Sequence, residues 1–136
     1  MIIHKNITVS SRGRGFYLIT NELEQQLGEL PDKGMVNLLL KHTSAGITIN
    51  ENADPSVRTD FETFISDLIP ENYSGYTHTM EGSDDMPAHI KSSLFGVNLT
   101  LPVINGRLDM GTWQGIYLCE FRNSPGRRKI TATIYS

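Results

Sequence analysis

Disulfides and membrane spans are both missing from this sequence of 136 residues. Its single cysteine, Cys119, has no partner for an internal disulfide, and its place in the apolar run GIYLCEF predicts a buried thiol. No apolar stretch reaches the roughly 18–20 residues that a membrane span needs. The opening residues MIIHKNITVS lack the basic, apolar and small-residue zones of a signal peptide. We therefore expect a cytoplasmic protein that does not bind membranes.

Positive charge is also scarce, with 12 Lys and Arg residues against 15 Asp and Glu residues and a net charge of −3. A chain of this charge, without interleaved aromatic and basic residues, is not expected to bind nucleic acid. The charge is unevenly placed. Residues 51–85 carry nine acidic side chains against Arg58 alone, whereas residues 96–136 carry five basic side chains against two acidic ones. This asymmetry fits either a solvated acidic face or a cation site beside an anion site.

Periodic apolar segments separated by turn signals predict one folded domain over residues 1–136. Residues 2–9 and 15–20 are rich in β-branched side chains and flank the turn sequence SRGRG, so we expect a β-hairpin there. Residues 35–43, MVNLLLKHT, form a nearly continuous apolar run. Such a run predicts a central strand that is covered on both faces.

Two helices are predicted in the first half of the chain. The first has Asn21 and Glu24 as a capping box and ends before Pro31. The second begins with Asp54 as its cap and Pro55 in the first turn, and it ends at Pro70. Its apolar residues share one helical face, which predicts that the helix packs against the core through Val57, Phe61, Phe64, Ile65 and Leu68.

A long loop and a strand-rich region make up the remainder of the chain. Residues 71–86 show no period and are expected to form a functional loop. A short helix follows, capped by Asp85 or Met86 and ended by Gly96. From Val97 onward the sequence predicts strands throughout, with one turn at Asn105–Gly106. The order of elements predicts an α+β fold with a mixed or mostly antiparallel sheet and helices on one side.

Three of the four histidines, His42, His78 and His89, fall in the middle of the chain. Their spacing matches no compact zinc motif, but each lies at the end of an element or in an irregular segment, where distant side chains can converge. They fit either ordinary hydrogen-bonded histidines or the three ligands of a catalytic zinc ion. Asp85 and Glu81 are then candidates for carboxylates that orient an imidazole or act as a general base, although Asp85 also fits a simple helix cap.

Other polar segments point to an anion. In HTSAG, Ser44 and His42 share one side of a strand, but no GxSxG elbow is present, so we expect the hydroxyls to bind an oxyanion rather than to attack a substrate. The GTWQG segment, residues 111–115, fits a β-bulge or a place where a ligand comes close to the backbone. Four arginines fit either a phosphate clamp or exposed turns: Arg107, Arg122, Arg127 and Arg128.

Long strings of the sequence carry a family signature. They are HTSAGITINENADPSVRTDF (residues 42–61), EGSDDMPAHIKSSLFG (81–96), INGRLDMGTWQGIYLCEFRN (104–123) and GRR (126–128). In this order they resemble the YjbQ-like proteins, an uncharacterised family described in places as secondary thiamine-phosphate synthases. The resemblance implies a small α+β fold that assembles as a homotrimer, with motif residues in pockets near the subunit boundaries.

The resemblance also implies roles for individual residues. A divalent metal, zinc more than magnesium, would be held by His42, His78 and His89. Glu51 and Asp85 match the motif positions that we expect to act as acid, base or metal-orienting carboxylates. The expected substrate-binding residues are Ser44, Arg107, Thr112, Gln114 and Arg128.

Together these features predict a metal-dependent enzyme acting on a phosphorylated or anionic metabolite. Thiamine-phosphate synthesis would join a pyrimidine pyrophosphate to a thiazole phosphate, and such reactions usually use magnesium held by carboxylates. A histidine-rich zinc site suits the activation of water or of a carbonyl better. The alternative hypothesis is a non-catalytic trimeric module that binds a ligand or a partner without turnover.

Overall fold

The computed structural model describes residues 1–136 as two antiparallel sheets and three helices, which confirms the α+β class. The larger sheet has the order β1-β8-β3-β5-β6 and the smaller one the order β2-β7-β4. The strands are β1 Ile2–Ser11, β2 Gly15–Leu18, β3 Lys33–Leu40, β4 Ala45–Glu51, β5 Asn98–Ile104, β6 Arg107–Leu108, β7 Gln114–Glu120 and β8 Gly126–Tyr135. The helices are α1 Thr20–Leu27, α2 Pro55–Leu68 and α3 Asp85–Phe95. None of these helices has the length and apolarity needed to cross a membrane.

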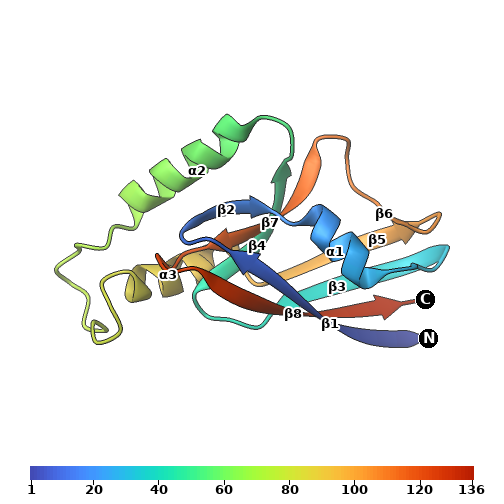
Figure 1. Cartoon of the computed structure of the whole chain (residues 1–136), viewed down its shortest axis with the longest axis horizontal. Helices are drawn as coiled ribbons and strands as arrows, with labels where there is room; N and C mark the ends of the chain where they lie inside the picture. Colours follow the sequence, from blue (N-terminus) through green and yellow to red (C-terminus); the bar gives the residue numbers. More distant parts are fainter.

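The strand pairing differs from the expected N-terminal hairpin. β1 pairs with β8 along its whole length, from Ile2 opposite Tyr135 to Ser11 opposite Gly126, whereas β2 pairs with β7 in the other sheet. The prediction was wrong because turn residues report a change of direction but not which strand lies alongside. Figure 1 shows the consequence, with both termini side by side at one end of the molecule; the Met1 amino group donates to the Ser136 carbonyl oxygen at 2.8 Å.

The main core lies between the two sheets. It contains 17 buried residues, which come mostly from strands of both sheets and include Leu23 and Leu27 of α1. No side chain caps α1, so the predicted capping box at Asn21 is absent, and the helix is held instead by these two leucines. Packing of an apolar face therefore decides where α1 forms, as is usual for short helices.

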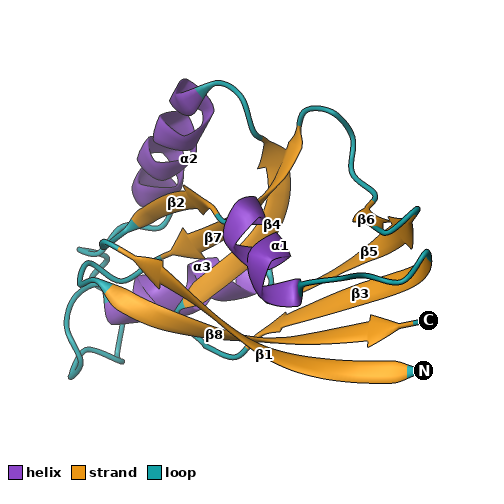
Figure 2. Cartoon of the chain, turned by 45° about the vertical axis from the view of Figure 1, so that its right-hand side comes forward, coloured by secondary structure: helices purple, strands orange, loops and turns teal.

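β7 is the strand that is covered on both faces. Ile116 and Leu118 face the main core, whereas Tyr117 and Cys119 face a second cluster built from aromatic rings. That cluster lies under α2 and α3, and Figure 2 shows α2 on the outer side of β2, away from β1 and β8. β3 was expected to have this double cover, but its outer face is open, as shown by the exposed Met35 and Leu39.

α2 begins as predicted but packs less completely than its apolar face suggests. Asp54 Oδ1 accepts the Ser56 backbone N–H at 2.9 Å, which confirms the predicted cap. Of the apolar face only Ile65 is buried, while Phe64 is 67% exposed and Leu68 is 58% exposed. The expectation of a fully core-facing helix was therefore wrong, because the four-residue strand β2 is too short to cover the whole helix.

Candidate functional site

Two histidines and one aspartate converge where α3 begins. Asp85 is the first residue of α3, His89 lies one turn further along the same helix, and His78 comes from the loop between α2 and α3. Asp85 Oδ2 lies 2.7 Å from His78 Nε2 and 3.0 Å from His89 Nε2. The metal-binding atoms of the three side chains all lie within 4.8 Å of one another. We call these three residues the His–Asp cluster.

Asp85 is buried, and its carboxylate does not cap the helix as the sequence suggested. The cap position belongs to Asp84, which makes no side-chain cap hydrogen bond because its carboxylate binds Arg122 and the Asn123 backbone N–H instead. Burial opposes the charge of Asp85, but the hydrogen bond from His78 and the charges of His89 and Arg122 outweigh it and lower the pKa of Asp85. The cluster therefore contains an ionised carboxylate.

The hydrogen bonds of His89 show which of its ring nitrogens carries a proton. Its Nδ1 lies 2.8 Å from the Thr43 carbonyl oxygen, which can only accept a hydrogen bond, so Nδ1 carries a proton. In the neutral ring the lone pair on Nε2 then faces Asp85 Oδ2 at 3.0 Å. Two electron-rich atoms at this distance repel unless a second ring proton or a metal cation lies between them. A backbone carbonyl on the far nitrogen is also the usual support of a metal-binding histidine.

Arg122 holds the other side of the aspartate pair. Its guanidinium donates to Asp85 Oδ1 at 2.6 Å, to Asp84 Oδ2 at 2.9 Å and to the Glu81 carbonyl oxygen at 3.0 Å. One side chain thus fixes the start of α3 and the loop that carries His78. It occupies Oδ1 of Asp85 and leaves Oδ2 to the two imidazoles.

His42 is not part of the His–Asp cluster. Its Nε2 accepts the Lys129 backbone N–H at 2.8 Å. Partial burial and the nearby positive charge of Arg128 lower the pKa of His42, so the ring is held neutral. His42 and His89 nevertheless line the same cleft of about 620 Å³, which extends along α3 to Gly96.

Arg128 and Ser44 are joined by a hydrogen bond close to His42. Glu120 is fully buried and accepts two hydrogen bonds from Arg128 and a third from the Ser11 hydroxyl. Arg128 also donates to the Ser44 carbonyl oxygen at 3.2 Å. The guanidinium of Arg128 therefore anchors the turn that carries His42, and most of its donors are already in use.

The remaining predicted residues lie away from the histidines. Glu51 and Gln114 are paired at the far end of β4 and β7, six strand positions or about 20 Å from Ala45. Arg107 is exposed on β6, the edge strand of the larger sheet. Within one chain, the predicted set thus divides between the histidine end and the far end of the smaller sheet, with Arg107 outside both.

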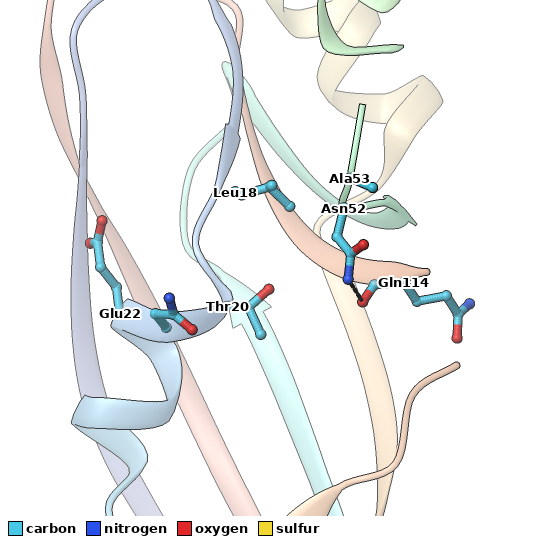
Figure 3. Close-up of a pocket in the computed structure, with 7 residues that line it drawn as sticks. Leu18, Thr20, Glu22, Asn52, Ala53 and Gln114 are labelled. Carbon is cyan, nitrogen blue, oxygen red and sulfur yellow. Dashed lines mark hydrogen bonds between the residues drawn. The ribbon is translucent and has the colours of Figure 1, made fainter. Parts of the chain in front are cut away.

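A pocket of about 590 Å³ occupies that far end, with Leu18 and Thr20 on one side and Asn52 and Gln114 on the other (Figure 3). Asn52 Nδ2 donates to the carbonyl oxygens of Thr112 and Gln114. Glu22 is its one carboxylate, and no histidine or cysteine lines it. Of the three residues of the His–Asp cluster, His89 lines the cleft that also contains His42.

Sequence reasoning did not single out Glu120 or Lys91. Glu120 is an acid inside the apolar run of β7, and a buried acid requires a partner, which is a signal that the sequence does carry. Lys91 is fully buried in α3 with Nζ 5.8 Å from the Phe121 ring centre, and burial lowers the pKa of Lys91. Arg122 was expected either in a phosphate clamp or in an exposed turn, and nothing local in the sequence indicates its aspartate partners.

Comparison with protein families gives a match over residues 5–136 to a family described as "UPF0047 protein YjbQ-like". The chain is similar to "UPF0047 protein YjbQ" of Escherichia coli O157:H7, with 50% identity over 98% of each chain. It is also similar to "UPF0047 protein YugU" of Bacillus subtilis strain 168, with 46% identity over 76% of each chain.

Solved structures with a similar fold include members of the same family and conserved proteins of unknown function. A YbjQ-like protein of unknown function from Sulfolobus solfataricus P2 superposes with a TM-score of 0.84 at 27% identity, covering 98% of this chain and 96% of that chain. A conserved hypothetical protein from Thermus thermophilus gives a TM-score of 0.83 at 35% identity, covering 93% of this chain and 96% of that chain.

Proposed function

This chain belongs to the YjbQ-like UPF0047 family, and on that premise we propose that it is a metal-dependent enzyme acting on a small anionic or phosphorylated molecule. The observation that carries the proposal is the shared oxygen of Asp85. Two imidazole nitrogens face it, and one of them, His89 Nε2, has its proton on the opposite side of the ring. A cation bound by all three atoms removes the repulsion that exists when the His89 ring is neutral.

The chemistry of the donor atoms favours zinc over magnesium. Two nitrogen donors and one carboxylate oxygen match the ligands of catalytic zinc sites, whereas magnesium prefers oxygen donors alone. When bound, such an ion supplies Lewis-acid activation of water or of a carbonyl. The chain's own part is to hold its ligands in place: Thr43 orients His89, and Arg122 orients Asp85.

Thiamine-phosphate synthesis is a less direct fit for the single chain. Displacement of diphosphate needs several cationic donors around the leaving oxygens. Arg128 is bound to Glu120, and Arg107 lies on the edge strand β6. We therefore favour hydrolysis or carbonyl chemistry on a small anion. The homotrimer stays a prediction, and in it Glu51 and Gln114 would reach a histidine cleft only if they approach that of a neighbouring chain.

The first test is elemental analysis of the purified, tag-free protein with three alanine variants. We expect about one zinc per chain in the wild type, and its loss in His78→Ala and His89→Ala. His4→Ala is the matched control, because His4 is exposed and bonds only to Thr133, so this variant should keep its zinc. Full zinc occupancy in both cluster variants would contradict the proposed site. Zinc-loaded protein should hydrolyse some member of a panel of phosphate esters and lactones; ligand binding without turnover would favour the non-catalytic module.

A further inference from the structure

The cleft beside the His–Asp cluster contains His42, which was expected to be a metal ligand but lies outside the cluster. His42, Thr43 and Ser93 line this cleft together with His89, so a ligand there lies directly beside the cluster. Its volume of about 620 Å³ is in the range of small-molecule sites. Several of the lining groups are hydroxyls or ring nitrogens, which can donate hydrogen bonds.

The contact with Lys129 decides which atom His42 can offer. A backbone N–H can only donate, so His42 Nε2 must accept it at 2.8 Å and cannot carry a proton. The ring proton is then on Nδ1, and the only side-chain hydrogen bond of His42 within the chain is made by Nε2, so Nδ1–H is available to a ligand. An Nε2 atom that is already hydrogen-bonded to the backbone is also not free to bind a metal.

The charge around the cleft favours an anion. Arg128 and Lys129 both act on His42 as positive charges, and the one nearby acid, Glu120, is neutralised by its ion pair with Arg128. The neighbouring Asp85 is likewise paired with Arg122. A bound divalent ion at the His–Asp cluster would add to this positive potential.

We propose that this cleft binds the anionic group of the substrate, a phosphate or a carboxylate, and that His42 donates its Nδ1–H to that group instead of binding the metal. The inference rests on the proposed function for the neighbouring metal, and it changes the ligand set implied by the family resemblance to His78, Asp85 and His89. His42 is then a substrate-binding residue that distinguishes anions from neutral molecules.

Two substitutions of His42 test the role of its Nδ1–H, with inorganic phosphate as the probe and isothermal titration calorimetry of the zinc-loaded protein as the measurement. His42→Asn places an amide N–H near the position of Nδ1, whereas His42→Ala removes the donor. We expect His42→Ala to weaken phosphate binding by about 10–100-fold and His42→Asn by less than about threefold. Both variants should keep one zinc per chain. Loss of zinc in His42→Ala, or unchanged phosphate affinity, would overturn the proposal.

A second measurement keeps this result separate from the metal assignment. Nitrogen-15 spectra of the imidazole rings in metal-free protein report which nitrogen of His42 carries the proton. We expect protonated Nδ1, and a phosphate-induced shift of the His42 ring that is absent for His4. A proton on Nε2, or no shift, would contradict the role of His42 even if zinc binds. Absence of zinc from the wild type, with the His42 shift present, would contradict the proposed function alone.

Discussion

The two ends of strands β4 and β7 are built from the same sheet but by different interactions. At the Ala45 end lie buried charges: Glu120 with Arg128, and Asp85 with Arg122 and two imidazoles. At the Glu51 end the contacts are mainly neutral, such as the hydrogen bonds of Asn52 with two backbone carbonyl groups. The sheet therefore separates an end with buried, paired charges from an end held mainly by neutral hydrogen bonds.

This difference follows from the cost of burying charge. A buried ion without a partner is strongly unfavourable, so each charge at the Ala45 end is fixed by specific partners in a specific geometry. Neutral amides tolerate looser geometry, because an unpaired amide near the surface can bind water instead. The same change of a carboxylate to an amide should thus have unequal effects at the two ends.

The largest effect is expected for metal binding. Asp85→Asn removes the charged oxygen between the two imidazoles and should weaken zinc binding by more than about a hundredfold, beyond the range for residues that only support a ligand. Glu51→Gln makes the same chemical change at the other end and should leave zinc affinity unchanged. Competition with a chromophoric chelator measures both. Equal zinc affinity in the two variants would mean that Asp85 is not a ligand.

Stability should show the next largest difference. Glu120→Gln leaves the buried Arg128 without its countercharge and should lower the free energy of unfolding by about 3–5 kcal/mol. Asn52→Ala removes neutral hydrogen bonds at the other end and should cost about 1 kcal/mol. Urea denaturation measures both values. A joint replacement, Glu120→Leu with Arg128→Met, should cost less than Glu120→Gln alone; if it costs more, the buried pair is itself a net source of stability.

Substitution of Arg122 should lower zinc affinity more than it lowers the stability of the fold. Arg122→Gln releases Asp85 Oδ1 and the loop that carries His78, so we expect zinc affinity to fall by about 10–100-fold. Arg122→Lys should recover little, because one ammonium cannot span both aspartates and a carbonyl. Arg127→Gln is the control, since Arg127 is an exposed arginine near the same turn. Unchanged zinc affinity in Arg122→Gln would show that Asp85 is held without it.

The smallest effect concerns the helix cap at the Glu51 end. The Ser56 backbone hydrogen bond lowers the pKa of Asp54 below its ordinary value of 3.8, so the ionised cap stabilises the fold above that pH and loses its effect as the pH falls through the lowered pKa. Asp54→Ala should lower the melting temperature by about 2–5 °C at pH 7 and by less at pH 3. Asp54→Asn should melt close to the wild type at pH 7. Calorimetry at the two pH values tests this; a constant difference would exclude the charge as the cause.

Features that depend on neighbouring residues were predicted well from the sequence. The Asp54 cap is one, and the Asn105–Gly106 turn is another, with positive φ at both residues as a two-residue hairpin turn requires. The apolar run around Cys119 also predicted its buried thiol, and burial raises the pKa of this thiol. Such signals need no knowledge of what lies across the fold.

Features that depend on distant partners were predicted less well. The sequence named His78, His89 and Asp85 as candidates but did not separate them from His42, because the decisive contact is with the Lys129 backbone. One local signal was available: Asp85 and His89 are four residues apart, which places them on one face of a helix. The same limit explains β1, whose partner β8 is not indicated by any nearby turn.

The pairing of β1 with β8 has a consequence for the order of folding. Their ladder joins the first and last strands and ends in a hydrogen bond between residues 135 positions apart. During synthesis β1 leaves the ribosome long before its only partner strand β8 exists, so the backbone edge of β1 stays unpaired until β8 has been made. Contacts of such long sequence separation slow folding, and closure of this ladder is expected to be a late step that depends on the final strand.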